Sequence, residues 1–175
     1  IIVIYCILKQ KNAYTDPKII KKISETQNFS FDFEQLIKDK KETGNCIISF
    51  NNKMICKYDE TGKLIVSNGK TLLIKNKNSN FANTYKTENT YFKYFLNKEF
   101  LISKIEGSII EKEQSFLLSI NEQNNQLNIF FDKNNYLKKG WETIDLYGNK
   151  VVSNIIVKGI NQKFSDDIFN LNLNN

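Results

Sequence analysis

The chain has 175 residues, of which 41% are hydrophobic and 13% aromatic, and its formal net charge is +6. This length and composition are typical of one globular domain with its own core, and they exclude an intrinsically disordered chain. The chain contains no His, which removes the commonest general base and the commonest metal ligand.

All 25 basic residues are Lys, and they are spread along the whole chain. Nucleic-acid-binding proteins present a basic patch or stripe, and Arg makes their bidentate contacts to phosphate and guanine. We therefore expect no nucleic-acid partner. No pattern in the sequence places a nucleophile, a base and an orienting group together, so we expect no enzymatic activity, no cofactor and no metal site.

The first eight residues form an unbroken apolar run that is too short to cross a bilayer as a helix. The run matches the hydrophobic region of a secretory signal peptide, whereas a buried first strand is the alternative interpretation. We expect residues 1–13 to be the remnant of a signal peptide, with Ala13 as the best small residue for cleavage. Residues 14–175 are then the functional domain.

Three cysteines are present, and none is in a Cys-x-x-Cys motif. Cys6 could carry a lipid, but the preceding Ile4-Tyr5 pair lacks the small residues that such a site requires. Cys46 and Cys56 lie in one predicted hairpin. A two-residue turn would place them on opposite faces, and a shift of one residue would place them opposite each other. The sequence therefore does not decide whether they form a disulfide.

The chain after the apolar run begins with a helix and continues as strands. Asp16-Pro17 supplies an N-cap and a first helical residue, and isoleucines at helical spacing predict an amphipathic helix over 17–26. Phe29, Phe31 and Phe33 then alternate with polar residues, which predicts a half-buried strand. A turn over 39–44 and four further strands joined by short turns follow, at 46–50, 53–58, 63–67 and 71–75.

The middle of the chain breaks this pattern. Residues 76–89 are polar and predict a loop, whereas 90–105 are rich in Phe, Tyr, Leu and Ile at spacings that favour short helices. Such an insert predicts a lid over the sheet, with an ordinary packing helix as the alternative. Strands are predicted again at 108–113, 115–121, 126–132, 138–145 and 150–158, and 165–169 predict a turn that leads to a last strand.

The expected fold is mainly β (α+β). About ten to eleven short antiparallel strands should form an incomplete β-barrel or strongly curved sheet, with an N-terminal helix and short lid helices over an apolar concave face.

The order of these motifs resembles the LolA family of periplasmic outer-membrane lipoprotein carriers. The segments that carry the resemblance are Phe33-Glu-Gln35, Gly44 to Ser49, Lys53 to Asp59, Ile65 to Leu73, Trp141 to Asn149 and Ile168 to Leu171. Two positions depart from the family pattern: Phe50-Asn51 replaces an Arg-Pro pair before the third strand, and Leu73 replaces a Trp. In relatives that Arg helps the lid to close, so a lid switch of that type is in doubt here.

The resemblance implies a monomeric periplasmic chaperone that carries the acyl chains of lipoproteins. Its partners would be acylated lipoproteins, an inner-membrane lipoprotein-releasing transporter and an outer-membrane lipoprotein receptor. Alternatives of the same fold are a lipid-binding sensor domain and the outer-membrane receptor itself. The lipid-binding candidates are the apolar-face residues of each strand and of the lid: Phe29, Phe31, Phe33, Ile48, Phe50, Met54, Tyr58, Leu64, Val66, Leu72, Ile74, Phe92 and Phe95.

Overall fold

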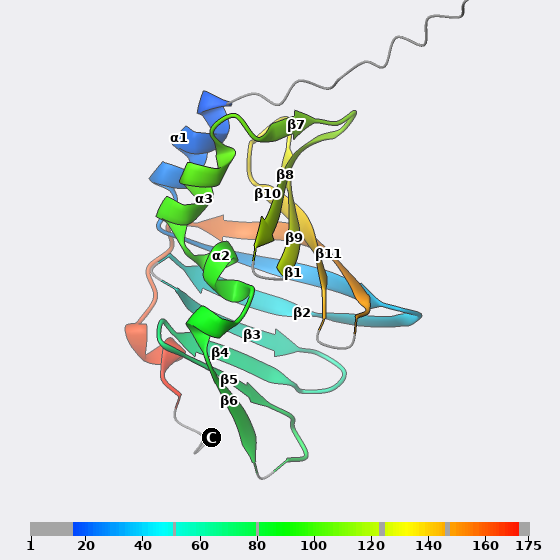
Figure 1. Cartoon of the computed structure of the whole chain (residues 1–175). Helices are drawn as coiled ribbons and strands as arrows, with labels where there is room; N and C mark the ends of the chain where they lie inside the picture. The colour runs from blue at the N-terminus through cyan, green and yellow to red at the C-terminus, as the bar shows by residue number, and fades with distance from the viewer. Residues whose placement is uncertain (1–15, 51, 80, 123–124, 146–147, 172–175) are drawn as a thin grey trace, which may run out of the picture.

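A computed structural model describes residues 16–50, 52–79, 81–122, 125–145 and 148–171. The expected signal-peptide remnant and Cys6 lie outside these described residues. Eleven antiparallel strands form one curved sheet in the order β6-β5-β4-β3-β2-β1-β11-β10-β9-β8-β7 (Figure 1). The strands are β1 (Asn28–Ile37), β2 (Lys40–Ser49), β3 (Lys53–Tyr58), β4 (Leu64–Asn68), β5 (Thr71–Lys75), β6 (Ala82–Lys86), β7 (Ile109–Glu111), β8 (Ser115–Glu122), β9 (Asn125–Asp132), β10 (Lys138–Ile144) and β11 (Lys150–Ile160).

The sheet consists of two meanders joined by the pairing of the first strand with the last. Strands β1 to β6 follow one another on one side, β7 to β11 on the other, and β1 pairs with β11 between them. In the described part of the chain no ladder joins β6 to β7, so these are the two edges of an open sheet. The expected curved antiparallel sheet is confirmed, whereas a closed barrel is not supported.

Three helices lie across the concave face of the sheet (Figure 1). They are α1 (Pro17–Glu25), α2 (Phe92–Leu96) and α3 (Lys98–Ile105), and the last two form the predicted lid segment, residues 90–105. Asp16 caps α1 by accepting a hydrogen bond from the Lys18 backbone N–H at 2.8 Å. Ile19 and Ile23 are buried on the inner side of this helix.

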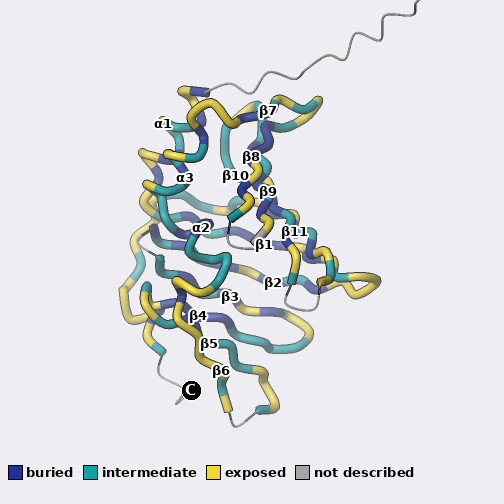
Figure 2. The backbone as a smooth tube through the Cα atoms, viewed as in Figure 1, coloured by how far each residue is buried: buried dark blue, intermediate teal, exposed yellow. Residues whose placement is uncertain are grey.

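Alternation along the long strands decides which side chains enter the core. Buried and exposed positions alternate along the strands (Figure 2), and in β1 the three phenylalanines are buried whereas Asp32 and Glu34 are exposed. Lys38, with a φ of 53°, stands in the tight connection to β2. The second strand therefore begins at Lys40, inside the stretch 39–44 that was expected to be a turn.

The hairpin of β2 and β3 decides the open question about the cysteines. Ser49 pairs with Lys53, so three residues, 50–52, connect the strands instead of the expected two. Asn52 adopts the left-handed conformation (φ 67°) that such a connection needs. Cys46 and Cys56 become direct partners with a Cα–Cα distance of 4.1 Å, and they form a disulfide.

Two local expectations differ from the structure. Residues 82–86 form the edge strand β6 within the expected loop, and the polar, mostly exposed side chains of this strand conceal it in the sequence. At the C-terminus, Asp166–Phe169 form a short 3-10 helix, η2, as the predicted turn suggested. The expected last strand does not begin at 170–171, and the residues after Leu171 lie outside the described part.

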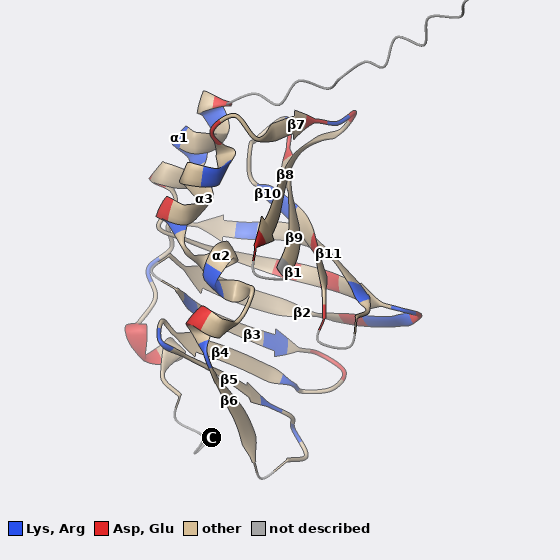
Figure 3. Ribbon diagram, viewed as in Figure 1, with Lys and Arg blue, Asp and Glu red and all other residues tan. Residues whose placement is uncertain are grey.

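The outer face of the sheet has a small apolar cluster of its own. Element η2 contacts β3 and β4, and Lys53 forms an ion pair with Asp166 at 3.0 Å. Phe169 is buried there and lies outside the hydrophobic cluster of the concave face. Lys and the acidic residues are interspersed along the strands and helices (Figure 3).

We predict that the disulfide contributes measurably to stability. The bond closes a loop with a sequence separation of 10 residues, so its removal should lower the free energy of unfolding by about 2–3 kcal/mol. Urea unfolding of the Cys46→Ala/Cys56→Ala double variant measures this loss. A reductant should reproduce the loss in the wild type and have no effect on the variant, and equal wild-type midpoints with and without reductant would contradict the prediction.

Candidate functional site

The concave face is built from rows of apolar side chains that run across neighbouring strands. Because the strands pair in register, each row takes one residue from each strand. One row consists of Val157, Phe31, Cys46, Cys56, Ile65 and Ile74, and the next consists of Phe29, Ile48, Met54, Ser67 and Leu72. The result is a continuous apolar wall with the disulfide near its middle.

The lid segment packs its own aromatic side chains onto this wall. Asn97 ends α2 and caps α3 by accepting a hydrogen bond from the Phe100 backbone N–H at 2.7 Å, so the two short helices meet at a fixed bend. Tyr94, Phe95 and Leu96 are buried, and Phe92 is partly buried against the same cluster.

An inner pocket lies between the lid and the wall. Its lining is Phe31, Phe33, Gln35, Cys46, Ile48, Met54, Cys56, Tyr58, Ile65, Tyr91, Phe92, Phe95 and Trp141. The unfilled volume is only about 20 Å³, which is room for about one water molecule. The lid rings therefore occupy almost all of the space that the concave face offers.

Phe95 is the most central side chain of the lid segment. It is 2% exposed, and its ring centroid lies 4.8 Å from that of Trp141. Trp141 in turn contacts Phe31 edge-to-face, at 6.1 Å between ring centroids. The indole Nε1–H of Trp141 is buried and has no hydrogen-bond partner among the described residues, although a buried donor normally has one.

The structure brings eleven of the thirteen predicted lipid-binding residues to the concave face. Seven line the inner pocket: Phe31, Phe33, Ile48, Met54, Tyr58, Phe92 and Phe95. Phe29, Phe50, Leu72 and Ile74 belong to, or pack against, the same hydrophobic cluster. Whether these residues bind lipid stays a prediction.

Leu64 and Val66 do not fit the expected arrangement. In β4, Ile65 is the partner of Cys56, and Leu64 and Val66 pair with Lys57 and Ile55. Their side chains therefore belong to the outer face, where Val66 is buried outside the concave cluster. The expected parity was wrong because Ile65, Val66 and Ser67 are buried in succession, so alternation in β4 does not reveal the inner face.

Several lining residues lie outside the set that the sequence predicts. Gln35 continues the alternation of the three phenylalanines, and its side-chain oxygen accepts a hydrogen bond from Ser153 Oγ at 3.4 Å. Tyr91 precedes the first lid helix. Burial raises the pKa of the Tyr91 hydroxyl, and burial followed by the nearby Glu42 carboxylate raises the pKa of Tyr58. Both hydroxyls are therefore neutral at physiological pH.

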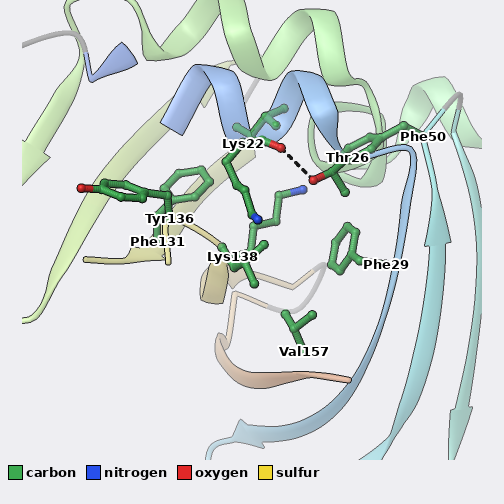
Figure 4. A pocket seen from close by; sticks show the side chains of 10 residues that line it. Lys22, Thr26, Phe29, Phe50, Phe131, Tyr136, Lys138 and Val157 are labelled. Carbon is green, nitrogen blue, oxygen red and sulfur yellow. Dashed lines mark hydrogen bonds between the residues drawn. The ribbon is translucent and has the colours of Figure 1, made fainter. Parts of the chain in front are cut away.

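A second pocket, of similar volume, opens beside α1 and is called the rim pocket below. It is lined by Lys22, Ile23, Thr26, Phe29, Phe50, Phe131, Tyr136, Leu137, Lys138 and Val157 (Figure 4). Its unfilled volume is also about 20 Å³. Lys22 from α1 and Lys138 from β10 both extend into it (Figure 4).

Lys138 is a buried lysine inside an aromatic cage. Its Nζ lies 4.2 Å from the ring centroid of Phe95, 4.8 Å from that of Phe50 and 5.1 Å from that of Phe29. It donates one hydrogen bond, of 3.3 Å, to the backbone oxygen of Phe95 and so joins α2 to β10. Burial lowers the pKa of this amine from its usual 10.5 to about 7.

Neither a metal site nor a membrane span is found in the described residues. No group of three or more His, Cys, Asp or Glu side chains there is placed to hold a metal ion. Within the same ranges no helix has both the length and the apolar character needed to cross a membrane.

An open antiparallel sheet whose concave face is covered by helices from the same chain defines a known class of proteins. A family model described as "Outer membrane lipoprotein carrier protein LolA" matches residues 24–172. The chain therefore belongs to the LolA family. No curated protein matches its sequence.

Solved structures show similar folds at low sequence identity. A proposed outer membrane lipoprotein-sorting protein domain from Vibrio parahaemolyticus has a TM-score of 0.50 and 12% identity, over 87% of this chain and 95% of that one. A LolA superfamily protein from Nitrosomonas europaea has a TM-score of 0.44 and 10% identity, over 90% and 98% of the two chains. The first of these supports the fold assignment and nothing beyond it.

The buried amine of Lys138 predicts a pH-dependent stability. Between pH 7 and 10.5 the unfolded chain binds a proton at this amine that the folded chain does not, so wild-type stability rises with pH in this range. Lys138→Met removes the effect. The variant should be more stable than the wild type by several kcal/mol below pH 7, since each pH unit between the two pKa values corresponds to about 1.4 kcal/mol.

The measurement is urea unfolding of both proteins across this pH range. The stability advantage of the variant should shrink as the pH approaches 10, and Lys139→Met, at an exposed neighbouring position, should show no such trend. A constant difference between the Lys138→Met variant and the wild type would contradict the lowered pKa.

Proposed function

We propose that this protein is a periplasmic carrier that binds the acyl chains of lipoproteins released from the inner membrane and delivers them to the outer membrane. It would act as a monomeric chaperone, without catalysis, between an inner-membrane transporter and an outer-membrane receptor. One observation carries the proposal: the apolar wall of the sheet is covered by aromatic rings from a separate segment of the same chain, with almost no space left between them.

The lid rings occupy the place that an acyl chain would take. Burying an acyl chain contributes about 0.8 kcal/mol per CH₂, but the chain can enter only if rings such as Phe92 and Phe95 leave the wall. The net affinity is then the difference between two hydrophobic burials. A carrier needs such a moderate affinity, because it must release its cargo at the far side.

The indole N–H of Trp141 also supports the binding of acylated ligands. Its Nε1–H is buried at the inner pocket, and no described residue supplies an acceptor. A lipoprotein acyl chain is attached through an ester or amide carbonyl, and that oxygen could accept the indole hydrogen bond once the lid has moved. This contact would exchange an unsatisfied buried donor for a satisfied one, which favours binding by about 1–3 kcal/mol.

The chain contains a single Trp, which makes a direct binding test possible. A synthetic peptide carrying a diacylglyceryl cysteine should change the emission of Trp141 in a saturable titration, whereas the same peptide without acyl chains should have no effect. Native mass spectrometry should show one acylated peptide per protein chain. No binding of the acylated peptide by either method would overturn the proposed function. Binding without transfer to acceptor vesicles or to a receptor would favour a lipid-binding sensor.

Replacing the central lid ring should separate stability from binding. Phe95→Ala leaves a cavity at the pocket, so it should lower the free energy of unfolding by about 3 kcal/mol and raise the affinity for the acylated peptide. Phe169→Ala is the matched control, because Phe169 is as deeply buried but lies on the outer face. This control should lose stability with no gain in affinity. Equal affinities of the two variants would show that Phe95 does not compete with the ligand.

A further inference from the structure

Among the described residues, the lining of the rim pocket contains basic side chains and no acidic side chain to pair with them. Two of its lining residues are lysines, and none is Asp or Glu. Lys22 and Lys138 reach into it from opposite sides, one from α1 and one from β10 (Figure 4). The rest of the lining is mostly aliphatic and aromatic. Such a pocket combines an apolar wall with an unmatched cationic centre.

Some other lysines that are partly buried have a carboxylate partner, and Lys138 has none among the described residues. Lys63 and Lys133 each lie within hydrogen-bonding distance of a carboxylate, Glu42 in the first case and Glu111 in the second. Lys138 is more deeply buried, yet among the described residues it has no ion pair and only one hydrogen bond, to a backbone oxygen. A buried ammonium group carries three donors and is stable only when it is paired, so the site lacks an anionic partner.

The rim pocket also adjoins the inner pocket. The ring of Phe95, which lines the inner pocket, lies 4.2 Å from the Lys138 Nζ and 4.8 Å from the Trp141 ring, measured from its centroid. When this ring leaves, the space at Lys138 becomes continuous with the apolar wall. An amphiphile could then place a charged end at Lys138 and an acyl chain along the wall.

We propose that the rim pocket is a head-group site for a single-chain anionic amphiphile, in which the carboxylate of a long-chain fatty acid pairs with Lys138 and Lys22. This inference rests on the proposed function, because it assumes that the inner pocket receives the acyl chain. A carboxylate fits better than a bulkier head group, since the pocket is small and its wall is otherwise apolar. The lowered pKa of Lys138 agrees with this assignment, because burial disfavours the charged form of this amine and a bound carboxylate would favour it.

Calorimetric titration with sodium palmitate and methyl palmitate tests the site, because these ligands share the chain and differ in the head group. Wild type should bind palmitate at least about tenfold more tightly, as expected for a charge-assisted hydrogen bond. Lys138→Met should abolish this preference and Lys22→Met should weaken it, whereas Lys139→Met should retain it. Sodium acetate should bind weakly, because it lacks the chain.

A second measurement does not depend on any variant. Titration in buffers of different ionisation enthalpy at about pH 8 should show that wild type takes up a proton with palmitate and none with methyl palmitate, because the Lys138 amine becomes charged. The other ionisable groups around this amine are Lys22, Lys98 and Tyr136. Proton uptake that persists in Lys138→Met would come from another group, such as the palmitate carboxylate itself, and would overturn the role of Lys138.

The outcomes separate this inference from the proposed function. If neither palmitate nor methyl palmitate binds, and the acylated peptide also fails, the acyl-carrier proposal itself is wrong. If both ligands bind with equal affinity, the pocket accepts acyl chains and the head-group site is wrong. A preference for palmitate that survives Lys138→Met, in a variant that still unfolds cooperatively, overturns the assignment in the same way.

Discussion

The pairing of β1 with β11 is the constraint on which the rest of the structure depends. This contact joins the two meanders into one sheet and leaves β6 and β7 at its opposite edges. The chain between these edges must therefore travel across the whole sheet, and it does so over the concave face as the lid segment (Figure 1). A ligand on this face competes with a segment whose two ends are fixed far apart.

Much of this fold could be predicted from the sequence, because its periodicities are strong. The alternating phenylalanines of β1 predict a strand and the aromatic lid segment predicts short helices, and both predictions are confirmed. The register was harder to predict. One additional residue in the β2–β3 connection made Cys46 and Cys56 partners, and consecutive burial in β4 hid the face on which Leu64 and Val66 lie. Such details depend on turn geometry and on packing against η2, which a period of two does not contain.

The candidate site was predicted in its apolar part and missed in its polar part. Hydrophobic alternation identifies a wall, but it does not show that a Lys shares that wall. Lys138 lies next to another Lys in the sequence. Regular alternation would place Lys139 on the same face as Trp141, but the irregular pairing between Lys138 and Gly140 directs Lys138 inward and leaves Lys139 exposed. The unpartnered indole of Trp141 is likewise a property of the packed structure. The polar groups that the sequence pattern does not reveal are the ones that would decide which ligand is preferred.

The position of the disulfide has a consequence for how the lid can be observed. Cys46 and Cys56 are only 3% and 6% exposed and lie in the floor of the inner pocket. A small thiol reagent reaches these sulfur atoms only while the lid segment is away from the wall, since exchange requires direct access to sulfur. The rate of reduction therefore reports how often the protein opens. A bound acyl chain would slow this reaction by shielding the sulfur atoms, so the rate of disulfide reduction would also report whether the inner pocket is occupied.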